Sequence, residues 1–92
     1  MESQPFQRDS NLFRARAAIE NAAADGADLL LLPEFFADGY TYDRRVAEAA
    51  EAIDGEVVKW MHDRSTQTGC WIAGSFVEKS HRRRDFDTLV LV

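Results

Sequence analysis

The sequence predicts an α/β fold in which helices pack on a sheet of mixed strand pairing. Apolar residues recur at helical spacing in two long segments, and three short apolar runs have breaker residues or charged segments next to them. In chain order these segments read helix, strand, helix, strand, strand, which is typical of an α/β protein. The last two strands are joined only by the charged segment Glu78–Asp85, so they most simply form an antiparallel hairpin.

The first helix is expected to start among Asp9, Ser10 and Asn11, three N-cap candidates in a row. No clear element precedes it in residues 1–8. One apolar face and one polar face follow at 3.6-residue spacing, with Leu12, Ala15, Ile19, Ala22 and Ala23 inward and Arg14, Asn21 and Asp25 outward. Gly26 stands where a glycine commonly ends a helix.

A short helix is expected over Arg44–Ala52, capped by Asp43, and the pair Asp54-Gly55 interrupts it as a turn. A second long helix follows over about Glu56–Thr68, and Gly69 ends it. The expected inward residues are Val46, Ala49, Ala50 and Ile53 in the short helix, and Val57, Trp60, Met61 and Thr68 in the long one.

Leu29 to Leu32 predict a strand buried on both faces, because a short uninterrupted apolar run is typical of a strand covered by helices. Pro33 has no N–H for a ladder, so this strand should end there. Cys70–Val77 predicts the next strand, in which Gly74 marks a close backbone approach or a bulge. Phe86–Val92 predicts a final strand that is buried at least at its end.

Ninety-two residues are enough for one small domain, or for a piece of a larger one. The net charge of −5 argues against a nucleic-acid partner. A lone cysteine excludes an internal disulfide. The polar N-terminus lacks the apolar core of a signal peptide. The longest apolar run is too short to span a bilayer. A cytoplasmic protein without membrane contact is the expectation.

Glu34 is the leading candidate for chemistry. It follows Pro33 at the carboxyl end of a predicted strand, which is where α/β sheets place their ligand crevices. With Phe35 and Phe36 beside it, its pKa should be raised, as a general base working near neutrality requires. The alternative is that Pro33 and Glu34 begin a helix, where both residues are favoured. The residues alone leave these two interpretations open.

The segment Leu29–Tyr40, LLLLPEFFADGY, resembles the first catalytic motif of the nitrilase-like carbon–nitrogen hydrolases. The resemblance implies that Glu34 is the general base of a Glu–Lys–Cys triad. It also implies an α-β-β-α sandwich, of which residues 1–92 would form one layer of a single, truncated domain. Gly69–Phe76 resembles a later strand of that family, and Asp85–Thr88 resembles its aromatic-Asn-Thr motif with Asp87 at the usual asparagine position.

The same resemblance implies a small amide, nitrile or carbamoyl substrate and no metal or organic cofactor. Tyr40 and Tyr42 follow the glycine turn that lines the substrate pocket in that family, so Tyr40 is a candidate substrate contact, whereas Tyr42 is as well explained by packing. Family members associate through helix faces, which makes a homo-oligomer plausible. The lysine and cysteine motifs lie beyond this stretch of the family sequence, so we expect no activity from these residues alone.

Other candidate groups match no site pattern. Cys70 begins a predicted strand and is expected to be a core cysteine, and Lys59 and Lys79 are expected to be solvated. Metal-ligand spacings are absent, so a metal site is disfavoured; the residues considered for one are Glu34, Asp38, Asp43, His62 and His81. The arginines at 82–84 are expected to form a solvated loop.

Two other functions stay open on the sequence. A small sheet with uncovered edges could serve as a non-enzymatic interaction module or as an oligomeric subunit. A carboxylate-based metal phosphohydrolase is the weaker alternative, because it depends on the disfavoured metal site.

Overall fold

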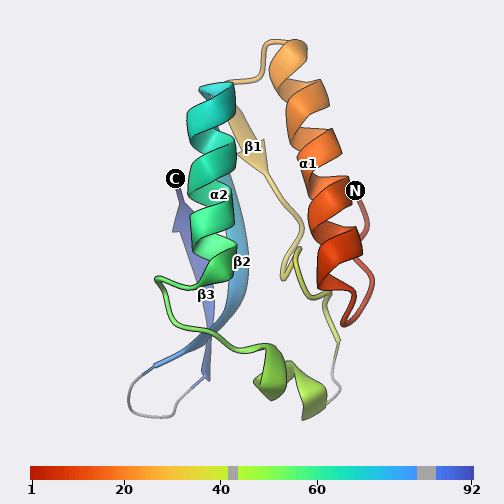
Figure 1. Cartoon of the computed structure of the whole chain (residues 1–92), viewed down its shortest axis with the longest axis vertical. Helices are drawn as coiled ribbons and strands as arrows, with labels where there is room; N and C mark the ends of the chain where they lie inside the picture. Colours follow the sequence, from red (N-terminus) through yellow and green to blue (C-terminus); the bar gives the residue numbers. More distant parts are fainter. Residues whose placement is uncertain (42–43, 81–84) are drawn as a thin grey trace.

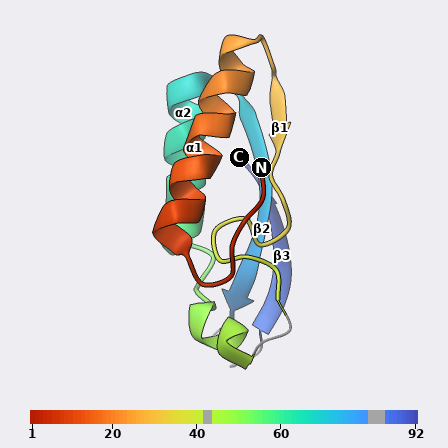
Figure 2. The same ribbon diagram turned by 90° about the vertical axis from the view of Figure 1, so that its right-hand side faces the viewer.

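The computed structural model describes residues 1–41, 44–80 and 85–92. Two helices lie side by side on one face of a three-stranded sheet (Figure 1), and the view from the side shows one helical layer and one sheet layer (Figure 2). The elements in chain order are α1 (Arg8–Ala24), β1 (Leu29–Leu31), the 3₁₀ helix η1 (Arg44–Ala49), α2 (Glu56–Thr68), β2 (Trp71–Lys79) and β3 (Asp85–Leu91).

The sheet has the strand order β1-β2-β3. β1 runs parallel to β2, with Leu30 opposite Ile72, and β2 runs antiparallel to β3, with Ser75 opposite Leu89. The α/β class, the mixed pairing and the terminal hairpin are therefore confirmed. β2 extends two residues beyond the predicted strand, to Lys79, which shortens the charged loop.

α1 begins at Arg8, slightly earlier than predicted. Its N-cap is Gln7, which makes no side-chain capping bond, so the expectation of a cap among Asp9, Ser10 and Asn11 is wrong. The reason is tertiary: Asn11 lies inside the helix with its amide turned toward other parts of the chain. The glycine stop is confirmed, since Gly26 has φ +92° and its N–H donates to the carbonyl of Ala23.

The inward face of α1 is as predicted for Leu12, Ala15 and Ile19, which are buried. Arg14 was expected on the solvated face, and this is wrong. It is only partly exposed, and its guanidinium donates to the side-chain oxygen of Asn11 at 2.9 Å.

The region before α2 is less helical than predicted. A 3₁₀ helix covers Arg44–Ala49 in place of an α-helix through Ala52, while the expected cap at Asp43 lies outside the described residues. Glu51 instead joins the sheet edge: its N–H donates to the carbonyl of Val77, and its carbonyl accepts from Lys79. Its carboxylate also accepts from the N–H of Val57 at 2.6 Å, in the first turn of α2.

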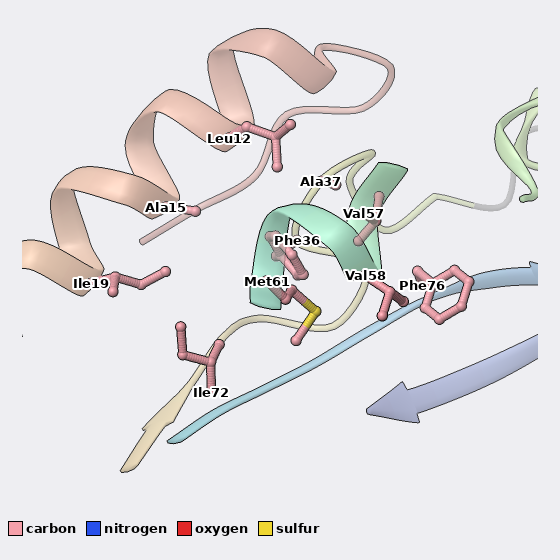
Figure 3. Packing of buried hydrophobic residues seen from close by; sticks show 10 residues of the cluster. All are labelled: Leu12, Ala15, Ile19, Phe36, Ala37, Val57, Val58, Met61, Ile72 and Phe76. Atoms are coloured by element: carbon pink, nitrogen blue, oxygen red, sulfur yellow. The ribbon is translucent and has the colours of Figure 1, made fainter. Parts of the chain in front are cut away.

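α2 ends as predicted at Gly69, whose φ of +72° suits glycine. The core lies between the helices and the sheet (Figure 3) and contains Leu12, Ala15, Ile19, Phe36, Ala37, Val57, Val58, Met61, Ile72 and Phe76. Gly74 provides the predicted close approach, because a Cβ there would lie 2.8 Å from the ring of Phe36.

The opposite face of the sheet, called the bare face below, is exposed along β1 and β3, although Ala73, Ser75 and Val77 of β2 share this face by register and are buried. Leu29 and Leu31 of β1 are exposed, as are Trp71, Leu89 and Leu91. The predictions that β1 is buried on both faces, and that the last strand is buried at its end, are therefore wrong for one face. The helices of this chain cover only the other face, toward which Leu30 and Val90 pack. None of the described helices is long and apolar enough to cross a membrane.

Candidate functional site

β1 leads directly into the turn that carries Glu34. The strand ends at Leu31, the N–H of Leu32 makes one more bond to the carbonyl of Ala73, and residues 34–38 form a turn. Glu34 is thus presented at the carboxyl end of a strand in a parallel pair. The alternative in which Pro33 and Glu34 begin a helix is not what the structure contains.

The turn is strained at Phe35, which has φ +50°, a left-handed conformation that non-glycine residues rarely adopt. The N–H of Phe35 donates to the hydroxyl of Ser75 in β2 at 3.0 Å, and its ring stacks on Tyr40 with centroids 5.7 Å apart. Phe36 points the other way, into the core. The sequence predicted that both phenylalanines flank Glu34. This is wrong, because Phe36 turns away into the core.

Glu34 itself is exposed, so the prediction that neighbouring phenylalanines place its carboxylate in apolar surroundings is wrong. Its pKa is nevertheless raised, mainly because its carboxyl group hydrogen-bonds with that of Asp87 in β3, with desolvation and charge repulsion from Asp87 adding to the effect. The direction agrees with the prediction, whereas the main cause is a second carboxylate and not apolar surroundings.

The two carboxylates lie on the bare side of the sheet. Side chains alternate along a strand, so Asp87 shares a face with Leu89 and Leu91, both of which are exposed. The hydroxyl of Ser75 accepts a hydrogen bond from the N–H of Phe35, and Ser75 lies opposite Leu89 in the β2–β3 pair. A carboxyl group with a raised pKa in this position can accept and return a proton.

Tyr40 follows the turn and is half exposed, with one ring face against Phe35. Its ring therefore lies beside Phe35, the residue that follows Glu34 in the chain. Tyr42 lies outside the described residues.

The other candidate groups do not gather around Glu34. Cys70 is buried, as predicted, and its thiol donates to the carbonyl of Ala27 at 2.9 Å. Lys59 and Lys79 are exposed, as predicted, and His62 is exposed too. His81 and the arginines at 82–84 lie outside the described residues.

Within the described part of the chain, no three His, Cys, Asp or Glu side chains are placed to hold a metal ion. Asp38 is engaged instead by Arg8, which donates to both of its carboxylate oxygens at 2.7 and 2.8 Å. Arg8 also reaches Glu51 at 2.8 Å, and its pKa is raised chiefly by the hydrogen bond to Asp38.

Sequence reasoning missed Arg8, Asn11 and Asp87 as neighbours of the site. Arg8 and Asp38 are 30 positions apart, so periodicity could not pair them. Asn11 was recognised only as a possible cap. The one available signal was Asp87, an acidic residue where the resembled motif has asparagine.

The chain is similar to carbon–nitrogen hydrolases by sequence and by fold. The carbon–nitrogen hydrolase family model matches residues 1–92. A nitrilase from Pyrococcus abyssi is 35% identical over 86% of this chain, which spans only 31% of that relative's length.

Solved structures of much lower identity share the fold. The nitrilase-superfamily protein Nit3 from Saccharomyces cerevisiae superposes with a TM-score of 0.82 at 20% identity, over 98% of this chain and 35% of its own. An N-terminal amidase gives 0.82 at 19% identity, over 100% and 23% of the two chains. A superfamily protein from Xanthomonas campestris gives 0.77 at 23% identity, over 98% and 36%. With a strand, Pro33 and Glu34 arranged as described and the family model matched from end to end, this chain belongs to the carbon–nitrogen hydrolase family.

Proposed function

We propose that this chain provides the general base, Glu34, of a hydrolase that cleaves non-peptide carbon–nitrogen bonds with a Glu–Lys–Cys triad. The observation that carries the proposal is the placement of Glu34 in the turn after β1, beside Asp87, with a raised pKa. A raised pKa lets a carboxylate both take up and release a proton close to neutral pH.

In the proposed reaction, Glu34 accepts the proton of a cysteine thiol, and the thiolate attacks the carbon of the C–N bond. A lysine stabilises the negative charge that develops on the tetrahedral intermediate. Glu34 then returns the proton to the leaving nitrogen, and water hydrolyses the resulting thioester to the acid and the free thiol. Cys70, Lys59 and Lys79 are not placed for these roles, so the lysine and the cysteine come from outside these 92 residues.

The proposed substrate is a small amide, nitrile or carbamoyl compound, with Tyr40 contacting it beside Glu34. The family supports this class, and two N-terminal amidase structures of the same fold are described with Asn-Glu and Gln-Val peptides. No metal or organic cofactor is part of the mechanism. A cytoplasmic location, suited to the unpaired thiol of Cys70, belongs to the same proposal.

The exposure of Glu34 fits this proposal if the rest of the domain covers the bare face of the sheet. The chain spans about a third of the nitrilase it resembles. In the intact domain the missing portion would exclude water from the carboxylate pair, which strengthens electrostatic interactions at the site.

The test is a chimera in which this chain replaces the matching segment of the Pyrococcus abyssi nitrilase. Glu34→Gln should lower its turnover of a small amide or nitrile by about 10²–10⁴-fold, because the proton acceptor is removed. Glu48→Gln, at an exposed glutamate of η1, is the matched control and should leave turnover unchanged. An active chimera that tolerates Glu34→Gln would exclude the general-base role. The 92-residue chain by itself should show no turnover.

The bare face also supports a second candidate, a non-enzymatic interaction module or oligomeric subunit. Its exposed apolar residues form the kind of patch that marks a protein contact. Sedimentation at micromolar concentration separates the two cases: a compact, stable dimer favours the module, and aggregation favours part of an enzyme.

A further inference from the structure

The turn that carries Glu34 is held mainly by the segment that precedes it at the N-terminus. The hydroxyl of Ser3 donates to the carbonyl of Phe36 at 2.6 Å. The N–H of Phe6 donates to the carbonyl of Asp38 at 2.8 Å. Between them, the amide of Asn11 donates to the carbonyl of Ala37 at 2.9 Å. The backbone carbonyls of residues 36–38 therefore each accept a hydrogen bond from a residue outside the turn.

Asn11 is the centre of this arrangement. It is fully buried, and its amide nitrogen donates both to Ala37 and to the carbonyl of Gln4 at 2.7 Å. Its side-chain oxygen accepts from the N–H of Gln4 at 2.8 Å and from Arg14 at 2.9 Å. An amide side chain offers two donors and one oxygen with two acceptor positions, so its full capacity is used. No other side-chain type of this size carries that combination.

Two further contacts leave the turn little freedom. Gly39 packs so closely on the N-terminal segment that a Cβ there would lie 2.7 Å from the backbone of Gln4 and Pro5. The guanidinium of Arg8 donates hydrogen bonds to both carboxylate oxygens of Asp38. Such an environment can keep Phe35 in its left-handed conformation, which costs about 1 kcal/mol or more without support.

We propose that Asn11 is a positioning residue for Glu34: by binding Ala37 and Gln4 together, its buried amide fixes the turn in the one geometry that presents the Glu34 carboxyl group to Asp87. The assignment of a catalytic purpose to this geometry rests on the proposed function. The positioning itself is a separate statement, because it concerns where the carboxyl group lies and not what it does.

The experiment is a carbon NMR titration of the Glu34 carboxyl group in this chain, comparing Asn11→Leu with the unsubstituted protein. Leucine has nearly the size of asparagine and adds no charge, but it makes none of the four hydrogen bonds. If Asn11 positions the turn, the carboxyl group of Glu34 leaves Asp87 and its pKa falls toward the ordinary glutamate value. Asn21→Leu, at an exposed position of the same helix, is the matched control and should leave the titration unchanged.

A purely structural role for Asn11 would lower the free energy of unfolding without moving the titration. An unchanged Glu34 pKa in folded Asn11→Leu would therefore overturn the proposal. If Asn11→Leu does not fold, Asn11→Ser decides, because its single shorter hydroxyl cannot bind Ala37 and Gln4 together as the amide does. A smaller fall of the Glu34 pKa in that variant supports positioning, and no change overturns it. Failure of the Glu34→Gln test would remove the catalytic purpose and leave this result intact.

Discussion

On one face of the sheet, Ile72 and Phe76 lie beneath α1 and α2 and are shielded from solvent. On the other face, Leu31 and Leu89 are 77% and 72% exposed, although they are equally apolar. Strands with apolar residues at both alternating sets of positions are typical of a sheet with a covering layer on each side. The described chain provides only one of these layers.

The two carboxylates of the proposed site lie on the uncovered side. Glu34 and Asp87 meet there, whereas the opposite face contains only packing residues and the buried segment of Phe36 and Ala37. The helix-covered face makes this piece of the fold stable, and the bare face is where a further layer would complete the proposed site.

Ile72→Ala should lower the free energy of unfolding by about 2–5 kcal/mol, because it opens a cavity among buried side chains. Leu89→Ala makes a similar change on the bare face and should cost less than about 0.5 kcal/mol. Urea denaturation monitored by circular dichroism measures both. Equal losses in the two variants would show that the bare face is covered in solution, for example by a second copy of the chain.

Arg8→Met should cost about 2–3 kcal/mol, somewhat less than the loss of a fully buried ion-pair partner, because Asp38 and Glu51 are left without their cation. Arg16→Met is the control on the solvated side of α1, where the exposed pair with Glu20 is worth only about 0.3–0.5 kcal/mol. Thermal unfolding compares the two. A loss for Arg8→Met no larger than that for Arg16→Met would mean that the Arg8 ion pairs do not hold the Glu34 turn.

Leu30→Ala and Leu31→Ala test the two faces within one strand. Leu30 packs partly against the core, so its truncation should cost about 1–2 kcal/mol, less than a fully buried leucine. Leu31 should be close to neutral. Denaturant midpoints measure the difference, and a reversal of the order would mean that β1 is turned over in solution.

Asp87→Asn should have the smallest effect on folding and a clear effect on Glu34. The pKa of Glu34 is raised in the folded state, so this interaction favours folding at low pH and is lost as the pH rises through that pKa. Removing the second carboxylate should lower the Glu34 pKa and so narrow the pH range, between the ordinary glutamate pKa and the folded-state pKa, over which stability falls as the pH rises. A carbon NMR titration measures the shift, with Asp85→Asn as control. An unaltered Glu34 pKa would mean that Asp87 does not contact it in solution.

Much of the fold could be predicted from local signals. Glycines at the ends of both helices and a proline after β1 act through their own backbone restrictions, and each was recognised in place. Helical spacing likewise identified Ile19, Val57 and Met61 as core residues. The N-cap of α1 could not be predicted, because the amide of Asn11 is used by residues 4 and 37 instead of by its own helix.

The sequence by itself determined the order of elements, the strand that stops before Glu34 and the family to which the motif belongs, because these depend on residues that are neighbours in the chain. Only the tertiary structure decided that Glu34 meets Asp87, that Arg8 binds Asp38 and that one face of the sheet is bare. Those features depend on contacts between residues 30 to more than 50 positions apart, and hydrophobic periodicity says that a face is apolar without saying what covers it.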